Sequence, residues 1–206
     1  MGPAKKTDLE RTLQGLEPVP RPRADIEQYP TPAGIAAEVA YMALGRGDLE
    51  GRTVLDAGCG NGVLGIAAAL LGARDVTGAD LDPEAVEVAG RNARRVGAKG
   101  RWVVSDVRAV EGPFDTVLMN PPFGSQRRHA DLPFLDAALR LGRVVYSFHN
   151  AKAEAFVLRR IRASGATITD RLEYAFPLGR AFAFHRRDVQ RIPVLLLRVE
   201  PQRRDK

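Results

Sequence analysis

The sequence is poor in cysteine and holds no long apolar run. Its one cysteine, Cys59, has no second cysteine for an internal disulfide. It is also too isolated for a zinc site built from this chain alone, because such a site usually takes four nitrogen or sulfur ligands. No stretch of about 18 apolar residues occurs that could span a membrane, and polar sequence follows Met1 to Lys6 where a signal peptide would be apolar. We therefore expect a cytoplasmic protein with no metal site of its own and no membrane contact.

Lysine is also scarce, whereas arginine is abundant. Lysine occurs only at positions 5, 6, 99, 152 and 206, yet the formal net charge is +6 and the pI about 9.9. This balance favours polyanionic partners such as nucleic acids, and arginine forms bidentate contacts with phosphate. A genomic bias toward arginine, alanine and glycine codons explains the same composition equally well.

The hydrophobic pattern alternates between strands and helices along a chain whose length of 206 residues fits one domain. We expect strands near 53–56, 76–79, 102–105, 115–119, 143–147, 168–174 and 193–199, and helices near 7–16, 33–44, 63–71, 83–96, 132–141 and 151–163. The last two strands follow one another without a helix, as in class I methyltransferases and unlike dinucleotide-binding Rossmann domains. The predicted fold class is α/β, Rossmann-like, with a seven-stranded mostly parallel sheet, a C-terminal antiparallel hairpin and helices on both faces.

The N-terminal region has a different composition from the rest. Leucines at 9, 13 and 16 lie on one side of the first predicted helix, and prolines at 18, 20 and 22 prevent its continuation. We therefore divide the chain into an N-terminal helix with a proline-rich connector, residues 1–26, and a methyltransferase domain, residues 27–206.

A glycine-rich turn follows the first long predicted strand. Asp56 ends that strand, and Gly58, Gly60 and Gly62 follow before a helix begins. Glycines allow a ligand to approach the backbone closely, and the start of a helix offers free N–H groups. A carboxylate at Asp56 would repel a pyrophosphate but suits the sulfonium and ammonium groups of S-adenosylmethionine. In the alternative interpretation Asp56 only caps the turn.

Two further acidic residues follow the next two strands. Asp80 lies where Rossmann-type folds place an acid on the ribose hydroxyls. Asp106 is placed to accept a hydrogen bond from the cofactor adenine, or alternatively to cap a turn, whereas Asp82 and Pro83 start a helix. The predicted cofactor site comprises Asp56, Gly58, Gly60, Asn61, Gly62, Asp80, Leu81, Asp106 and Asn120.

The predicted catalytic tetrapeptide, Asn120-Pro121-Pro122-Phe123, follows the fourth strand. A planar conjugated amine reacts slowly because its lone pair is delocalised. The Asn120 side-chain oxygen and the Pro121 carbonyl can accept both amino hydrogens and direct the lone pair toward the methyl group, while Phe123 offers a flat face for the target base. The tetrapeptide fits adenine, cytosine or a glutamine amide, and the Pro-Pro-Phe sequence favours a nucleobase.

Basic residues follow the tetrapeptide and the sixth strand. Arg127 and Arg128 suit the phosphates beside an extruded base, with a solvated charge run as the alternative. A second segment mixes aromatic and cationic side chains in a way that suits RNA, namely Phe184, His185, Arg186 and Arg187.

From about Leu9 to Val199 the chain resembles the methyltransferase-like protein five family. The matching residues, in the family's order, are Glu27-Gln28-Tyr29-Pro30-Thr31, Asp56-x-Gly58-Cys59-Gly60, Met119 to Gly124, Tyr146-Ser147-x-His149 and Phe184-His185. The resemblance implies methylation of one adenine amino group in small-subunit ribosomal RNA. It also implies that Gln28, Tyr29 and Thr31 line the cofactor site and that His149 belongs to the RNA-contacting set. Asn150 departs from the lysine common in the family, and Arg186 and Arg187 replace lysines.

The resemblance further implies a partner, a small zinc-binding methyltransferase activator with which relatives form a heterodimer. In the usual strand order of this fold the third strand lies at an edge of the sheet, and here Arg101 to Ser105 would form an apolar edge containing Trp102. We expect the activator to pair with this edge. Trp102 as an ordinary core residue is the alternative.

Three other functions fit parts of the sequence. A protein glutamine methyltransferase acting on a translation factor uses similar chemistry but normally needs a peptide-docking extension. A DNA adenine methyltransferase shares the tetrapeptide, and a catalytically silent RNA-binding protein would not need an intact Asn120. The prediction is methylation of adenine in ribosomal RNA with S-adenosylmethionine as cofactor.

Overall fold

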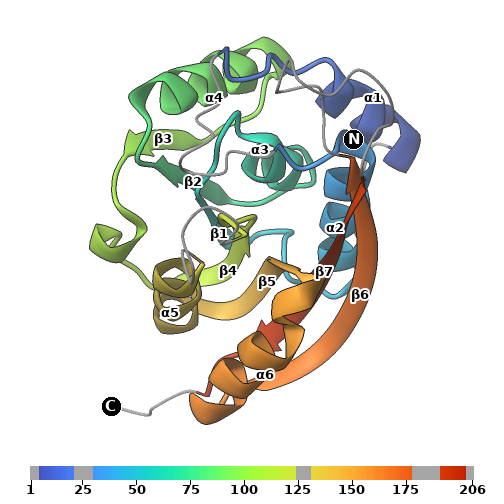
Figure 1. Ribbon diagram of the computed structural model, residues 1–206. Coiled ribbons are helices and arrows are strands. Elements are labelled where there is room, and N and C mark those ends of the chain that lie inside the picture. The colour runs from blue at the N-terminus through green and yellow to red at the C-terminus, as the bar shows by residue number, and fades with distance from the viewer. Residues whose placement is uncertain (1–4, 21–29, 124–130, 178–190, 203–206) are drawn as a thin grey trace.

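Seven strands form one sheet in the computed structural model, which describes residues 5–20, 30–123, 131–177 and 191–202 (Figure 1). The strands are β1 (Thr53–Ala57), β2 (Asp75–Asp80), β3 (Arg101–Val104), β4 (Phe114–Met119), β5 (Gly142–Asn150), β6 (Thr167–Pro177) and β7 (Arg191–Glu200). Their order is β3-β2-β1-β4-β5-β7-β6, and β7 is antiparallel to both of its neighbours. The predicted fold class is confirmed.

Helices cover both faces of this sheet (Figure 1). One face packs against α1 (Lys6–Gln14), α2 (Ala33–Gly45), α3 (Val63–Leu70) and α4 (Pro83–Val96), and the other against α5 (Leu132–Leu141) and α6 (Glu154–Ala163). Alternate strand residues serve the two cores, with Val54 facing the first and Leu55 the second. Within the described residues, no helix combines the length and apolar character needed to cross a membrane.

The ends of α4 follow directly from its sequence. The Asp82 carboxylate accepts a hydrogen bond from Glu84 N at 3.0 Å, and Pro83 occupies the first helical position. Gly97 ends the helix with φ +70°, a conformation that favours glycine. The structural role predicted for Asp82 is confirmed.

The N-terminal helix α1 packs into the first core. Leu9, Leu13 and Leu16 are all buried in the same cluster as α2 and α3, which agrees with the predicted apolar side of the helix. The proline-rich segment therefore starts from a helix that is fixed to the domain.

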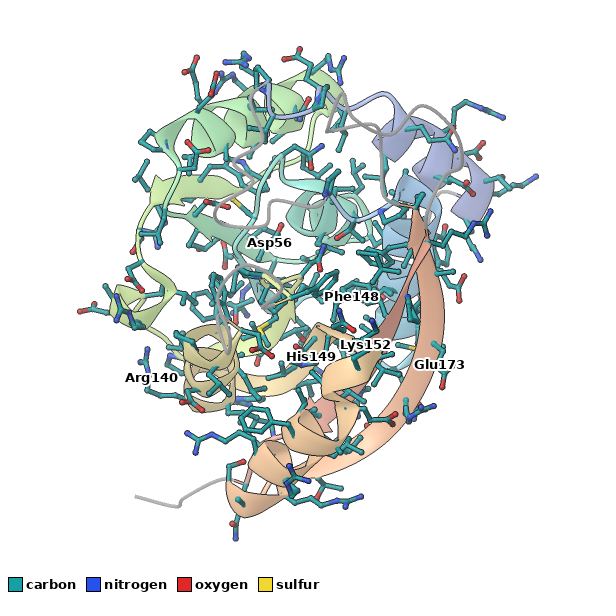
Figure 2. All side chains as sticks on the ribbon, viewed as in Figure 1. Asp56, Arg140, Phe148, His149, Lys152 and Glu173 are labelled. Carbon is teal, nitrogen blue, oxygen red and sulfur yellow. The ribbon has the colours of Figure 1, made fainter. Side chains whose placement is uncertain are left out.

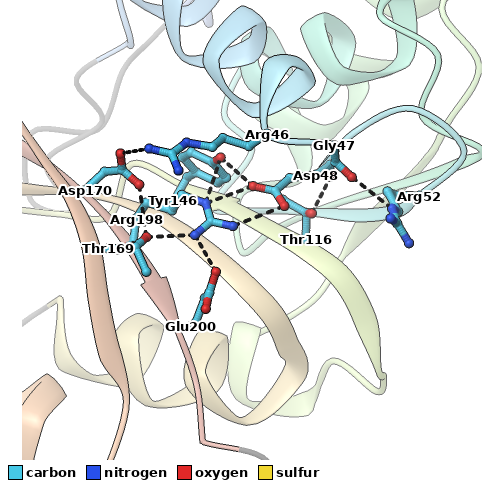
Figure 3. Close-up of polar contacts among 10 residues, drawn as sticks. All are labelled: Arg46, Gly47, Asp48, Arg52, Thr116, Tyr146, Thr169, Asp170, Arg198 and Glu200. Carbon is cyan, nitrogen blue, oxygen red and sulfur yellow. Dashed lines mark hydrogen bonds and ion pairs between the residues drawn. The ribbon is translucent and has the colours of Figure 1, made fainter.

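A buried polar network joins the loop between α2 and β1 to strands β4, β5 and β7 (Figure 3). Arg198 Nε donates to Asp48 Oδ2 at 2.9 Å, and the Tyr146 hydroxyl donates to the same oxygen at 2.6 Å. Burial and this carboxylate raise the pKa of Tyr146, which keeps the phenol a donor. Because Asp48 and Arg198 are both buried, replacing Arg198 would leave the Asp48 carboxylate inside the protein without its cationic partner, whereas Arg198 also pairs with Glu200 at 2.6 Å.

Strand β3 lies at a sheet edge, as predicted, but its tryptophan is partly buried against the first core. Gly78 of β2 is the register partner of Trp102, and a Cβ atom on Gly78 would overlap the indole. The ring also lies against Gly62 and Gly65 at the start of α3. Trp102 therefore packs in the protein's own core, which was the alternative interpretation, and Val104, 54% exposed, is the apolar side chain that this edge presents.

Candidate active site

The carboxyl ends of β1, β2 and β4 meet near the centre of the sheet. β1 lies between β2 and β4, and Ala57 at its end is in register with Met119. The chain leaves β1 toward α3 on one face and continues after β4 toward α5 on the other. In α/β sheets, ligands bind in the crevice at such a switch point. The fold thus brings together the glycine-rich turn and the predicted catalytic tetrapeptide.

The three glycines of the turn have different roles. Each has a positive φ, +72° at Gly58, +53° at Gly60 and +86° at Gly62, which favours glycine. A Cβ atom would lie 2.9 Å from Phe134 Cε1 at Gly58 and 3.1 Å from Trp102 Cη2 at Gly62, so these two glycines serve packing. At Gly60, no described atom would lie within 4 Å of a Cβ. Gly60 is therefore the glycine that a cofactor can approach.

Asp56 lies beneath this turn (Figure 2). Its Oδ2 accepts a hydrogen bond from Gly65 N at 2.7 Å, and the residue is 1% exposed. Burial raises the pKa of Asp56 to about 8, against the lowering effect of the Gly65 bond. Contact between Asp56 and the cofactor, directly or through water, stays a prediction. The carboxylate is enclosed and holds the first turn of α3, which was the alternative interpretation.

Asp80 ends β2 with both carboxylate oxygens held by backbone N–H groups. Oδ2 accepts from Gly60 N at 2.9 Å and Oδ1 from Asp82 N at 3.0 Å. Burial nevertheless raises the pKa of Asp80. The next side chain, Leu81, is 58% exposed. A fixed carboxylate beside Gly60, with an open apolar side chain next to it, fits the hydroxyl groups and the flat base of a nucleoside cofactor.

Asp106 caps the 3-10 turn Val107–Ala109. Its Oδ1 accepts from Arg108 N at 2.8 Å, and the carboxylate pairs with the Arg108 guanidinium at 2.5 Å. These contacts lower the pKa of Asp106. The structure therefore shows the capping role, while contact with the cofactor adenine stays a prediction.

The side chain of Asn120 is held by Thr31, which lies two residues before α2. Asn120 Nδ2 donates to Thr31 Oγ1 at 3.0 Å, and Thr31 is 6% exposed. The bond fixes which amide atom faces Thr31 and turns Oδ1, the atom that would accept a substrate hydrogen, the other way. Thr31, predicted to line the cofactor site, thus contacts the predicted catalytic side chain.

Phe123 does not offer an open face for a base. It is buried, and its ring packs edge-on against Phe176 of β6 with centroids 6.1 Å apart at 63°. The prediction that Phe123 stacks on the target base is therefore wrong for this arrangement, because its ring packs against Phe176 in the first core. Pro121 is also buried and Pro122 partly so.

His149 lies inside the protein (Figure 2). It is 1% exposed, with Nε2 2.6 Å from Ser147 Oγ and Nδ1 3.4 Å from Asp131 Oδ2. The predicted RNA contact of His149 is wrong in this structure. The reason is that β5 is an interior strand whose alternate side chains at 147 and 149 face α5.

Asn92 of α4, which no motif in the sequence indicated, joins the N-terminal segment to the glycine-rich turn. Its Oδ1 accepts from Glu17 N at 2.8 Å, and its Nδ2 donates to Glu17 O and Asn61 O, both at 3.0 Å. Asn61 Nδ2 also donates to Glu17 O at 3.2 Å, so the Asn61 side chain anchors this segment where a cofactor contact was predicted. The available signal was a polar residue on the apolar face of an amphipathic helix.

Eight predicted site residues lie outside the described part of the chain. They are Gln28, Tyr29, Arg127, Arg128, Phe184, His185, Arg186 and Arg187. Their predicted roles in cofactor or RNA binding stay predictions.

Comparison with known proteins agrees with this geometry. The family model of ribosomal protein L11 methyltransferase (PrmA) matches residues 37–121. The rRNA N(6)-adenosine-methyltransferase Mettl5 of Drosophila melanogaster is 37% identical over 97% of this chain and 98% of its own length. A crystal structure of a proposed RNA methyltransferase from Pyrococcus horikoshii is 39% identical, with a TM-score of 0.88 over 96% of this chain and 98% of that one. Magnesium protoporphyrin IX methyltransferase from Synechocystis, solved with S-adenosylmethionine bound, shares the fold, with a TM-score of 0.64 and 22% identity over 96% of this chain and 92% of that one.

These matches cover the chain differently. The PrmA match ends at residue 121, within the predicted catalytic tetrapeptide, whereas the Drosophila relative aligns along nearly the whole chain. A turn with one open glycine, a fixed carboxylate at the end of β2 and an oriented asparagine after β4 account for a cofactor-dependent methyltransferase at this switch point. The chain belongs to the Mettl5 family of S-adenosylmethionine-dependent methyltransferases.

Proposed function

We propose that this chain transfers the methyl group of S-adenosylmethionine to the exocyclic amino group of an adenine in ribosomal RNA, specifically that of the small subunit. The hydrogen bond from Asn120 to Thr31 is the observation that supports this most directly. It orients an amide at the switch point of the sheet, one strand away from the glycine-rich turn. The Drosophila relative, named for adenosine methylation in rRNA, supports RNA as the substrate class.

The protein's part in this reaction is to hold the target amine. S-adenosylmethionine, when bound, supplies an electrophilic methyl group on a positively charged sulfur. Asn120 Oδ1 and the Pro121 carbonyl would accept the two amine hydrogens, which strengthens the nitrogen lone pair and aims it. The fixed φ of Pro121 keeps its carbonyl oriented. This arrangement needs no general base before the methyl group is transferred.

Three described residues would hold the cofactor. The Asp80 carboxylate would accept hydrogen bonds from the ribose hydroxyls, the open space at Gly60 would admit the ligand, and Leu81 would cover the adenine. The carboxylate has the acceptor capacity for this role, since an ionised Asp offers about four lone-pair sites and the backbone occupies two of them.

A tritium-transfer assay tests the proposed function. Labelled S-adenosylmethionine is offered with total RNA, ribosomal proteins or genomic DNA, and the label is then traced to single nucleosides. We expect label in ribosomal RNA adenine and none with Asn120→Ala. Label in protein would instead support the activity named by the family model over residues 37–121, and label in no fraction would indicate a silent RNA-binding protein.

We further propose that the protein works as a heterodimer with a small zinc-binding activator docked on β3. Ser105 N donates to Asp80 O at 2.9 Å, and in a parallel pair alternate residues direct their backbone groups to the same neighbour. The N–H and C=O groups of Trp102 and Val104 therefore point outward. With the exposed Val104 side chain, they form an edge that a partner strand can pair with.

A further inference from the structure

The side chain of Asn92 on α4 is buried, and two segments distant in sequence use its hydrogen-bonding groups. It is 0% exposed. Its Nδ2 donates to Glu17 O and Asn61 O, both at 3.0 Å, and its Oδ1 accepts from Glu17 N at 2.8 Å and from Arg95 at 3.3 Å. A side-chain amide offers two donor hydrogens and an oxygen with two lone pairs. All of these are occupied, so an apolar side chain of the same size cannot replace Asn92.

The bond to Asn61 supports the centre of the glycine-rich turn, where packing gives no support. The glycines on either side of Gly60 pack against aromatic rings, whereas no described atom would lie within 4 Å of a Cβ at Gly60. A glycine without such neighbours keeps a wide range of backbone conformations. The turn closes on itself through Gly62 N, which donates to Cys59 O at 2.8 Å. That bond shapes the turn but does not fix it to the rest of the domain.

Two side chains from different elements fix the turn to the domain. At the end of β2, Asp80 Oδ2 accepts from Gly60 N at 2.9 Å. On α4, Asn92 Nδ2 donates to Asn61 O at 3.0 Å. Consecutive residues of the turn are therefore held by a carboxylate and by an amide. The amide keeps the turn in the position from which Gly60 N bonds to Asp80, the carboxylate that would bind the ribose.

Anchoring of the N-terminal segment does not by itself account for Asn92. The chain leaving α1 passes beside α4 (Figure 1), where Glu17 also pairs with Arg91 at 3.4 Å. The leucines of α1 are buried in the first core as well. This segment thus has other attachments, whereas the bond from Asn92 to Asn61 O acts on the turn itself.

We propose that Asn92 is a positioning residue for the cofactor, which holds the open part of the glycine-rich turn in its binding conformation. The proposal rests on the proposed function, in which Gly60 and Asp80 receive S-adenosylmethionine. Without the Asn92 amide the turn samples further conformations, and the cofactor binds only the fraction that is competent. Cofactor affinity therefore falls, while transfer from the bound cofactor, which depends on Asn120, changes little.

Four variants test this proposal. Asn92→Leu removes all of these bonds at similar volume, and Asn92→Asp keeps an acceptor for Glu17 N but loses the donor to Asn61 O. Arg91→Ala is the matched control on the same helix, because Arg91 pairs with Glu17 and, within the described residues, bonds to no atom of the turn. Tyr146→Phe controls for stability, since it removes a buried hydrogen bond of 2.6 Å on β5.

Calorimetry gives the dissociation constant of S-adenosylhomocysteine, and kinetics with ribosomal RNA give kcat and the KM for S-adenosylmethionine. We expect both Asn92 variants to raise the dissociation constant and this KM about tenfold while kcat changes less than about threefold. Arg91→Ala and Tyr146→Phe should leave both within about twofold, although Tyr146→Phe lowers the melting temperature. An equal loss of affinity in either control, or unchanged affinity in Asn92→Asp, would overturn the proposal.

Hydrogen exchange gives a readout that does not depend on the activity. In Asn92→Leu the amides of Gly60 and Glu17 should exchange faster, while those of β5 stay unchanged. Faster exchange at Glu17 alone would refute the proposal, because Asn92 would then only anchor the N-terminal segment. A wild-type protein that binds S-adenosylhomocysteine but labels no RNA would instead refute the proposed function alone, because the role of Asn92 is measured on cofactor affinity.

Discussion

Thr31 accepts a hydrogen bond from Asn120 at 3.0 Å across 89 residues of sequence. The segment before α2 therefore sets the orientation of the amide that would bind the target amine. Without this bond the amide could rotate, and the acceptor oxygen would no longer face the substrate in a single direction.

Thr31→Val should lower kcat about fivefold, because it removes an acceptor at equal volume and a neutral hydrogen bond contributes about 1 kcal/mol. Thr31→Ser should retain activity. Single-turnover kinetics measure the role of Thr31 in orienting Asn120, and calorimetry with S-adenosylhomocysteine measures its role in cofactor binding. A tenfold loss of cofactor affinity with normal kcat would show that Thr31 is a cofactor ligand, as the family resemblance implies.

Asp80→Ala should weaken cofactor binding by about 1.5–3 kcal/mol through the loss of charge-assisted hydrogen bonds. Asp75→Ala is the matched control, since Asp75 begins the same strand and pairs with Arg74 on the surface. Calorimetry with S-adenosylhomocysteine measures both. Unchanged affinity in Asp80→Ala would remove Asp80 from the cofactor site.

Asp56 should make the stability of the protein depend on pH. Its pKa is about 8 in the folded protein against an ordinary value of 3.8. Between these values the folded protein retains a proton that the unfolded chain has released, so the free energy of unfolding falls as the pH rises from about 4 to 8. Asp56→Asn has no such group to titrate, so this part of the pH dependence should disappear. Its free energy of unfolding should therefore rise relative to that of the wild type as the pH increases from about 4 to 8. Urea titrations at several pH values check this, and parallel curves for the two proteins would contradict it.

Val104→Pro should abolish docking of the proposed activator while leaving the fold intact. It removes an outward N–H at a sheet edge, where proline is tolerated. Val103→Pro should destabilise the protein itself, because alternation directs that N–H to β2. Co-purification with the activator, with Val104→Ala as control, measures association. Normal association of Val104→Pro would place the interface elsewhere.

Much of the fold could be predicted because its signals are local. The apolar run before Asn120 correctly predicted β4, and the Asp82-Pro83 pair correctly predicted the start of α4. The position of β3 at the edge followed from the fold class once the elements had been counted.

The roles of individual site residues were harder to predict because contacts between distant segments decide them. Phe123 is buried by Phe176 of β6, and His149 is enclosed because α5 brings Asp131 against β5. The sequence shows glycine at three positions of the turn. Only contacts with Phe134 and Trp102, which are distant in sequence, reveal that Gly58 and Gly62 serve packing. A one-dimensional pattern contains no information about such neighbours.

The position of β7 has a consequence for how the chain acquires its structure during synthesis. β7 is the last described strand, yet it lies inside the sheet between β5 and β6 and supplies Arg198 to the buried carboxylate of Asp48. While the residues of β7 are still in the ribosome, β6 cannot pair with its neighbouring strand in the sheet. The Asp48 carboxylate also lacks its ion-pair partner, the guanidinium of Arg198. The nascent domain therefore remains open along β5 until translation of β7 is complete, which makes this side of the protein the one that chaperones would need to shield.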